Sequence, residues 1–184
     1  LDHKIPFTSL KLWCKANGAG YVLVENLNSS LSIECLNEYS PDAVVYSGGG
    51  ILKTSFIEAA KNNIVNNHSG PLPEVRGMNA IEWSILLGHQ PSITIHMIDQ
   101  GIDTGEILSI KKLPIGEDDS IEIIRDKAVF FGVIEIVRLL DGLNDLNNLE
   151  REQNRGTLEG RQCYIMATAL RELLSKKLKG RLDV

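Results

Sequence analysis

The feature that most constrains this chain is an alternation of short apolar runs with helix-like segments in its first half. Residues 43–46 form a continuous apolar run, which is typical of a strand buried on both faces. After a glycine-rich stretch, Thr54 or Ser55 can cap a helix that extends to about Lys61, and residues 64–66 form another short strand. This alternation predicts an α/β fold: a Rossmann-like open, mostly parallel twisted sheet flanked by helices.

Further elements are expected on both sides of this unit. Residues 20–25 predict a short strand, and Asn28-Ser29-Ser30 offers the cap of a helix that ends at Pro41. The other expected elements are helices at 78–88, about 120–140 and about 161–178, and a strand pair at 92–98 and 106–113. The long helix carries an apolar stripe that we interpret as core: Ile121, Ile124, Ala128, Phe131, Ile134, Val137 and Leu140.

Two parts are expected along the chain. Residues 1–140 would form the catalytic domain, and residues 141–184 a polar loop followed by a short C-terminal helical extension. A chain of 184 residues is long enough to bury a substantial core. Its net charge of −5 makes its surface poorly suited to neutralising the phosphates of a nucleic acid. It contains no apolar run of the roughly 18 residues that a membrane span needs. The three cysteines form no CxxC pair, and we expect packed thiols in a reducing cytoplasm.

Asn66, His68 and Asp103 are the candidate catalytic residues. Side chains repeat every second position along a strand, so Asn66 and His68 point to the same side at the end of their strand. Two prolines and a glycine then impose a rigid, irregular backbone. Asp103 lies in a turn bracketed by Gly101 and Gly105. These side chains can therefore converge at the carboxyl ends of the strands, where ligands of α/β sheets gather.

An amide donor, an imidazole and a carboxylate together suit acyl transfer to an amine. The amide and a protonated imidazole can stabilise the oxyanion of a tetrahedral intermediate. The carboxylate can raise the imidazole pKa and help to remove the proton from the attacking amine. A structural interpretation stays open from residue types alone, because a histidine after a strand is often a hydrogen-bonding residue and Asn-rich loops are common turns.

Two longer segments around these residues resemble the signatures of the folate-dependent formyltransferases. This superfamily includes the methionyl-tRNA, sugar N- and glycinamide ribonucleotide formyltransferases. The first segment is NNHSGPLPEVRG at 66–77, and the second is TIHMIDQGIDTGEIL at 94–108. The resemblance covers about residues 20–140 and includes a helix at 80–85. By the family pattern the chain lacks the usual first strand, helix and second strand, which would leave an open sheet edge.

The resemblance implies roles for individual residues. Asn66 and His68 would stabilise the oxyanion on the transferring formyl group, while Asp103 would tune His68 and assist proton removal. The donor would be 10-formyltetrahydrofolate, with its pterin ring held largely by backbone groups of Tyr46, Gly49, Gly50, Ile51, Leu52 and Gly101. The glycine triplet at 48–50 departs from the larger side chains of relatives, and a flexible turn is its other interpretation.

The formyl acceptor is less constrained than the donor. The acidic charge and the short, polar C-terminal part count against tRNA, so we expect a small-molecule amine, namely an amino sugar attached to a nucleotide. The alternatives are a methionyl-tRNA formyltransferase-like enzyme, a 10-formyltetrahydrofolate hydrolase and a non-catalytic folate-binding module. We expect no metal, no nucleic acid and no membrane as partners, and leave a homodimer open.

Three other residues near the motifs bear on the site. His96 is in phase with Thr94 on its strand, and we interpret it as a packed or hydrogen-bonded residue, since no partner lies at metal-ligand spacing. Arg76 and Glu82 flank the active-site turn. Each could position a substrate or remain solvated, and the sequence alone leaves both open.

Overall fold

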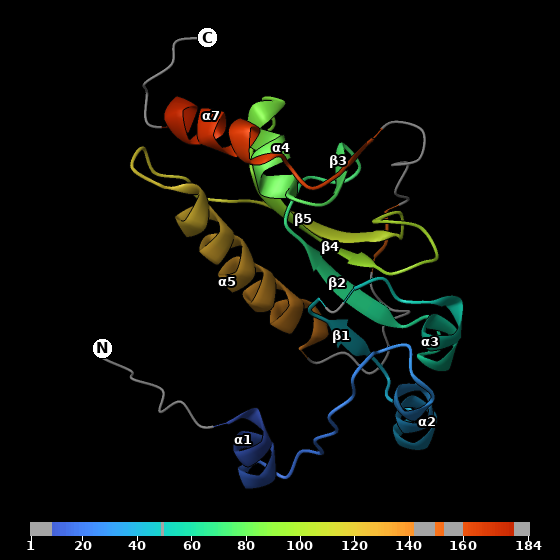
Figure 1. Cartoon of the computed structure of the whole chain (residues 1–184). Coiled ribbons are helices and arrows are strands. Elements are labelled where there is room, and N and C mark those ends of the chain that lie inside the picture. The colour runs from blue at the N-terminus through green and yellow to red at the C-terminus, as the bar shows by residue number, and fades with distance from the viewer. Residues whose placement is uncertain (1–8, 49, 142–149, 153–159, 179–184) are drawn as a thin grey trace.

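A four-stranded sheet organises the computed structural model, which describes residues 9–48, 50–141, 150–152 and 160–178 (Figure 1). The strand order is β1 (Val44–Tyr46), β2 (Ile64–His68), β4 (Ser92–Met97) and β5 (Ile107–Lys112). Strands β1 and β2 are parallel, whereas the pairs β2–β4 and β4–β5 are antiparallel. The α/β class with flanking helices is confirmed. The sheet is mixed rather than mostly parallel, because the connection from β2 to β4 reverses the chain instead of crossing over.

The β1–α3–β2 unit follows the predicted alternation. The preceding helix α2 (Ser30–Tyr39) begins as predicted, since the Ser29 side chain accepts a hydrogen bond from the Ser32 N–H. Helix α3 (Thr54–Ala59) instead follows Lys53, which forms no side-chain cap, so the prediction of a Thr54 or Ser55 cap was wrong. Strand β1 lies at the edge of the described sheet, and its Val45 is 48% exposed. The prediction of a strand buried on both faces was therefore also wrong.

Residues 20–25 form no strand, which corrects that prediction. Val22 and Val24 instead line a surface groove together with Cys35 and Leu36 of α2. Val22 and Val24 thus border helix α2, whereas Tyr21 and Leu23 are exposed, and the backbone of this segment joins no sheet.

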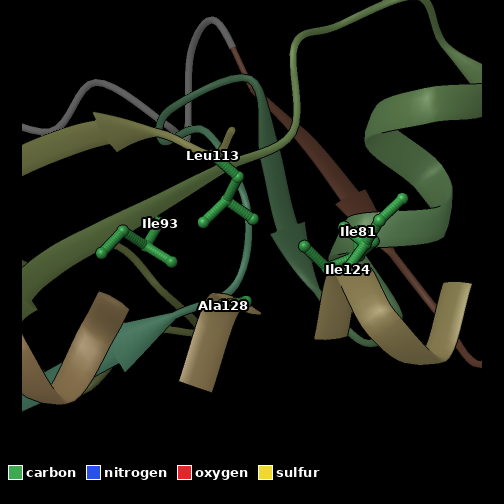
Figure 2. Packing of buried hydrophobic residues seen from close by; sticks show 5 residues of the cluster. All are labelled: Ile81, Ile93, Leu113, Ile124 and Ala128. Atoms are coloured by element: carbon green, nitrogen blue, oxygen red, sulfur yellow. The ribbon is translucent and has the colours of Figure 1, made fainter. Parts of the chain in front are cut away.

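The predicted hairpin is present as β4 and β5, and all six residues of β4 are buried. Helix α5 (Ile121–Leu140) follows, with the Ser120 side chain capping its first turn. It lies along one face of the sheet and contacts β2 and β4 (Figure 1). Figure 2 shows part of the core that α5 forms with α4 (Ala80–Leu86) and the strands: Ile81, Ile93, Leu113, Ile124 and Ala128.

The predicted apolar stripe of α5 follows the buried face only over its first half. Ile134 and Val137 are 48% and 60% exposed, while Glu135 and Ile136 face the sheet. From Phe131 onwards the predicted stripe advances in three steps of three residues. Each step turns about 300° around the helix axis, which is about 60° short of a full turn, so the stripe moves away from the face of α5 that packs on the sheet. The interpretation of the whole stripe as core was wrong for this reason.

The remaining elements are helix α1 (Leu10–Ala16), strands β3 (Val75–Gly77) and β6 (Arg161–Cys163), and helix α7 (Thr168–Leu178). Strands β3 and β6 form a separate two-stranded parallel sheet. The predicted C-terminal helix is therefore present but shorter, because residues 161–163 pair with β3 instead. Helix α7 contacts α4. Within the described residues, no helix is long and apolar enough to cross a membrane, and the three cysteines are free thiols.

Candidate active site

The antiparallel pairing of β2 with β4 positions the first part of the site. Asn66 is paired with His96, and His68 with Thr94. Opposite residues of an antiparallel pair project to the same face of the sheet. The Asn66 Nδ2 therefore lies 3.0 Å from the His96 Nε2, although the two residues are far apart in the sequence.

Asp103 reaches this pair from the turn between β4 and β5. Its carboxylate lies 3.4 Å from His68 Nδ1 through one oxygen and 3.6 Å from His96 Nε2 through the other. Its φ is +52°, a left-handed conformation that Asp tolerates better than most residues. The structure thus brings the three candidate residues Asn66, His68 and Asp103 together, with His96 between them.

The turn itself is closed by Asp99. One oxygen of its carboxylate accepts hydrogen bonds from the Gly101 N–H at 2.9 Å and the Thr104 hydroxyl at 2.6 Å. Gly105 packs so closely that a Cβ there would lie 1.9 Å from the Met97 carbonyl oxygen. The two glycines and Asp99 therefore keep Asp103 close to the end of β4.

His68 is buried, and its imidazole is held on both sides. Its Nε2 lies 2.8 Å from the Val75 carbonyl oxygen, which can only accept a hydrogen bond, so Nε2 carries a proton. Nδ1 faces Asp103. His68 can therefore donate to the carboxylate only as an imidazolium, because the neutral ring has its one proton on Nε2.

His96 has the opposite tautomer and stays neutral near pH 7. Its Nδ1 donates to the Met97 carbonyl oxygen at 2.7 Å, which leaves Nε2 to accept from the Asn66 amide. Burial lowers the pKa of His96 to about 4, and the positive charge of His68 acts in the same direction. The sequence interpretation of His96 as a packed, hydrogen-bonded strand residue agrees with this geometry. It missed the contact with Asn66, which only the β2–β4 register reveals.

A surface cleft opens beside this cluster. Its lining combines candidate catalytic residues, five of the six predicted folate contacts and neighbouring residues: Tyr46, Gly50, Ile51, Leu52, Asn66, His96, Ile98, Asp99, Gln100, Gly101, Ile102 and Asp103. Gly49, the sixth predicted contact, lies outside the described residues. His68 is not part of the lining and lies behind the cleft wall, next to Asp103.

The glycine-rich loop that borders the cleft has a conformational reason for its composition. Gly48 and Gly50 have φ values of +85° and +97°, which residues with a side chain rarely adopt. The Tyr46 hydroxyl donates to the Gly50 carbonyl and closes this loop. Burial raises the pKa of Tyr46, so its hydroxyl remains protonated and available as this donor.

Arg76 and Glu82 are both buried, so the open alternative of a solvated role does not hold for either. The Glu82 carboxylate accepts from Arg125 of α5 and from the Asn79 amide, and it does not line the cleft. Arg76 donates through Nη1 to the Ile102 carbonyl oxygen at 3.3 Å. Within the described ranges, no group of three His, Cys, Asp or Glu side chains could hold a metal ion.

Comparison with known families agrees with this arrangement. Residues 21–140 match the family described as formyl transferase. The chain belongs to the formyl transferase family. The match includes both motifs and every candidate site residue.

Among sequence relatives, the methionyl-tRNA formyltransferase of Finegoldia magna is 29% identical over 154 residues, which are 83% of this chain and 50% of the relative. The methionyl-tRNA formyltransferase of Anaeromyxobacter dehalogenans is 32% identical over 71% of this chain and 44% of its own length. The chain thus spans about half the length of these relatives.

Solved structures of formyltransferases share the fold. Phosphoribosylglycinamide formyltransferase from Streptococcus pneumoniae is 25% identical, with a TM-score of 0.60 over 73% of this chain and 82% of that one. The formyltransferase PseJ from Anoxybacillus kamchatkensis, in complex with UDP-4,6-dideoxy-4-formamido-L-AltNAc and tetrahydrofolate, is 20% identical. Its TM-score is 0.60, over 85% of this chain and 80% of that one. At this identity the second likeness concerns the fold alone.

Proposed function

We propose that this protein transfers a formyl group from 10-formyltetrahydrofolate to a primary amine. The observation that carries the proposal is the Asn66–His96 hydrogen bond at the wall of a cleft that Asp103 also lines. It occurs in a chain of the formyl transferase family. The cleft brings an amide donor and a carboxylate to one place, and formyl transfer to an amine needs both.

The folate would enter the cleft between the glycine-rich loop and the β4–β5 turn. Tyr46 and residues 49–52 would hold the pterin ring on one side, and Gly101 would contact it on the other. Ile51 is 77% exposed, so an apolar side chain is available to cover a bound ring. The formyl carbon would then lie near the Asn66 amide at the cleft wall.

The reaction would begin with attack of the amine on the formyl carbon. The Asn66 N–H groups would stabilise the developing oxyanion, and the neutral His96 would keep this amide oriented by accepting one of its hydrogen bonds. Asp103 would take the proton from the amine, directly or through water. His68 lies behind Asp103 and, when protonated, would donate to the Asp103 carboxylate and hold it in place for this proton transfer. Collapse of the tetrahedral intermediate would break the bond between the formyl carbon and N10 of the folate, and Asp103 would pass the proton on to N10, so that tetrahydrofolate and the formamide are released.

For the acceptor, we propose an amino sugar attached to a nucleotide. A net charge of −5 and a pI near 5.4 are unfavourable for a surface that binds a large RNA. Methionyl-tRNA is the second candidate, favoured by the activity of the sequence relatives from Finegoldia magna and Anaeromyxobacter dehalogenans. The two acceptors differ in the number of phosphates they present, so salt dependence separates them as well as product formation.

The test is to incubate the protein with 10-formyltetrahydrofolate and to follow release of tetrahydrofolate. Parallel reactions contain a UDP-linked 4-amino sugar, methionyl-tRNA, glycinamide ribonucleotide or no amine, and mass spectrometry identifies any formamide. Formylation of the sugar nucleotide supports the proposal. Formylation of the tRNA would show that methionyl-tRNA, and not an amino sugar, is the acceptor.

The remaining outcomes distinguish the other activities. Equal release without any amine indicates a hydrolase. Tetrahydrofolate binding without release under any condition indicates a folate-binding module. The matched variant is Asn66→Ala, which removes the proposed oxyanion donor. It should lower the amine-dependent release of tetrahydrofolate about 100-fold or more.

A further inference from the structure

Arg76 is a buried cation with no acidic partner in the described parts of the chain. Its side chain is only 8% exposed. No described carboxylate lies within ion-pair distance of it. Its Nε lacks a hydrogen-bond partner, and Nη1 donates to the Ile102 carbonyl oxygen at 3.3 Å. Burying a charge costs free energy unless the charge is paired. The burial of Arg76 therefore does not stabilise the fold in the way that a buried ion pair can.

The position of Arg76 on β3 connects it to the candidate active site. The next residue, Gly77, donates its backbone N–H to the Asp103 carboxylate at 2.7 Å. Two adjacent residues of β3 thus hold two adjacent residues of the β4–β5 turn. Arg76 holds the Ile102 backbone with its side chain, and Gly77 holds the Asp103 side chain with its backbone.

Strand β3 is itself anchored on its other side. It pairs in parallel with β6, and a Cβ at Gly77 would lie 2.2 Å from the Cys163 carbonyl oxygen. This close packing prevents β3 from moving away with the turn. The turn needs such support, because Asp103 has a positive φ, a conformation that persists only where the surroundings impose it.

We propose that Arg76 is a positioning residue for formyl transfer. Its guanidinium holds the Ile102 carbonyl against β3 and thereby keeps the Asp103 carboxylate directed at His68 and His96. With no carboxylate partner, the guanidinium is free to make its charge-assisted hydrogen bond to the turn. This inference rests on the proposed function for its catalytic consequence, whereas the hold on the turn stands independently.

The test compares Arg76→Met, Arg76→Lys and the control Arg138→Met. Arg138 is the control because its guanidinium also binds a buried group, the Glu135 carboxylate of α5, and neither of these hydrogen bonds involves the turn at 99–105. In Arg76→Met, hydrogen exchange at 99–105 should accelerate about tenfold or more. Its kcat should fall about 10- to 100-fold, as expected for a misplaced catalytic group, with KM for the amine changed less than about twofold.

Arg76→Lys keeps a cation that can donate to the Ile102 carbonyl, so it should recover most of both losses, and Arg138→Met should leave the exchange at 99–105 unchanged. Unchanged exchange in Arg76→Met overturns the proposal, as does acceleration spread evenly over the domain. Faster exchange with wild-type kcat removes the positioning role. If the wild-type protein releases no tetrahydrofolate, the proposed function fails, and the exchange data alone decide whether Arg76 holds the turn.

Discussion

The Asn66 amide donates a hydrogen bond to Nε2 of His96 across the β2–β4 pair, at 3.0 Å. This bond depends on His96 being neutral, because a protonated imidazole has no lone pair to accept it. The Met97 carbonyl selects the required tautomer by binding the other ring nitrogen. The orientation of the proposed oxyanion donor is therefore linked to the protonation state of a buried histidine.

Stability should decrease as the pH falls through the titration of His96. The folded-state pKa is about 4 and the unfolded-state pKa is near 6.5, so the unfolded chain binds more protons between these values. The stabilisation is fully present above about pH 6.5 and is lost progressively towards pH 4, on the order of 3 kcal/mol in total. Urea unfolding at pH 7, 5.5 and 4 measures this loss.

The matched variant for that measurement is His96→Gln. Glutamine can still accept a hydrogen bond from Asn66 through its side-chain oxygen, but it does not titrate. The variant should show a shallower decrease in the free energy of unfolding over the same pH range. An identical pH dependence in the two proteins would show that His96 is not the group responsible.

His68→Ala should abolish turnover while folate binding is largely kept. His68 is buried next to Asp103 and does not line the cleft, so its loss removes the imidazole that faces Asp103 without removing a predicted folate contact. We expect kcat to fall about 1,000-fold or more, in the range that loss of an essential proton-transfer or oxyanion group produces. Turnover and tetrahydrofolate affinity are measured on the same preparation. Wild-type-like turnover would remove the mechanism proposed for His68.

Asp103→Asn should separate the charge of this residue from its role in the turn. Asn tolerates a positive φ as well as Asp does, and its side-chain oxygen can still accept from the Gly77 N–H. The melting temperature should therefore stay within a few degrees of wild type, while kcat falls about 100-fold or more because the proton acceptor is lost. A retained kcat would assign proton removal to another group. Asp103→Ala, which cannot make the Gly77 bond, should be less stable than Asp103→Asn.

Gly77→Ala should destabilise the protein strongly. Gly77 has a φ of +93°, and a Cβ there would lie 2.2 Å from the Cys163 carbonyl oxygen. Strain from the positive φ costs about 1–2 kcal/mol, and the displacement of β6 should bring the total to more than about 3 kcal/mol. Gly88→Ala is the control, since Gly88 has a φ of +81° with open space around it. If denaturant unfolding gives the same loss for both variants, the packing of β6 against Gly77 is unimportant.

Local chemistry determined the parts of this protein that the sequence alone predicts. The cap of α2 at Ser29 depends on residues three positions apart. The β4–β5 hairpin depends on two strand patterns that flank a turn. The placement of Asn66 and His68 on the same face of β2 depends only on the two-residue period of a strand. Each of these features involves neighbours in the sequence, so residue pattern suffices to find it.

Tertiary structure decided what those local patterns leave open. The antiparallel β2–β4 register places His96 opposite Asn66, and the β3–β6 pair holds the residues that bind the turn of Asp103. Long-range packing against the sheet also decides which side of α5 is buried. Strand register and the choice of neighbour depend on contacts between distant segments, which a local apolar pattern does not specify. The sequence therefore identified the candidate residues Asn66, His68 and Asp103, whereas the tertiary structure determined which groups touch them, including His96.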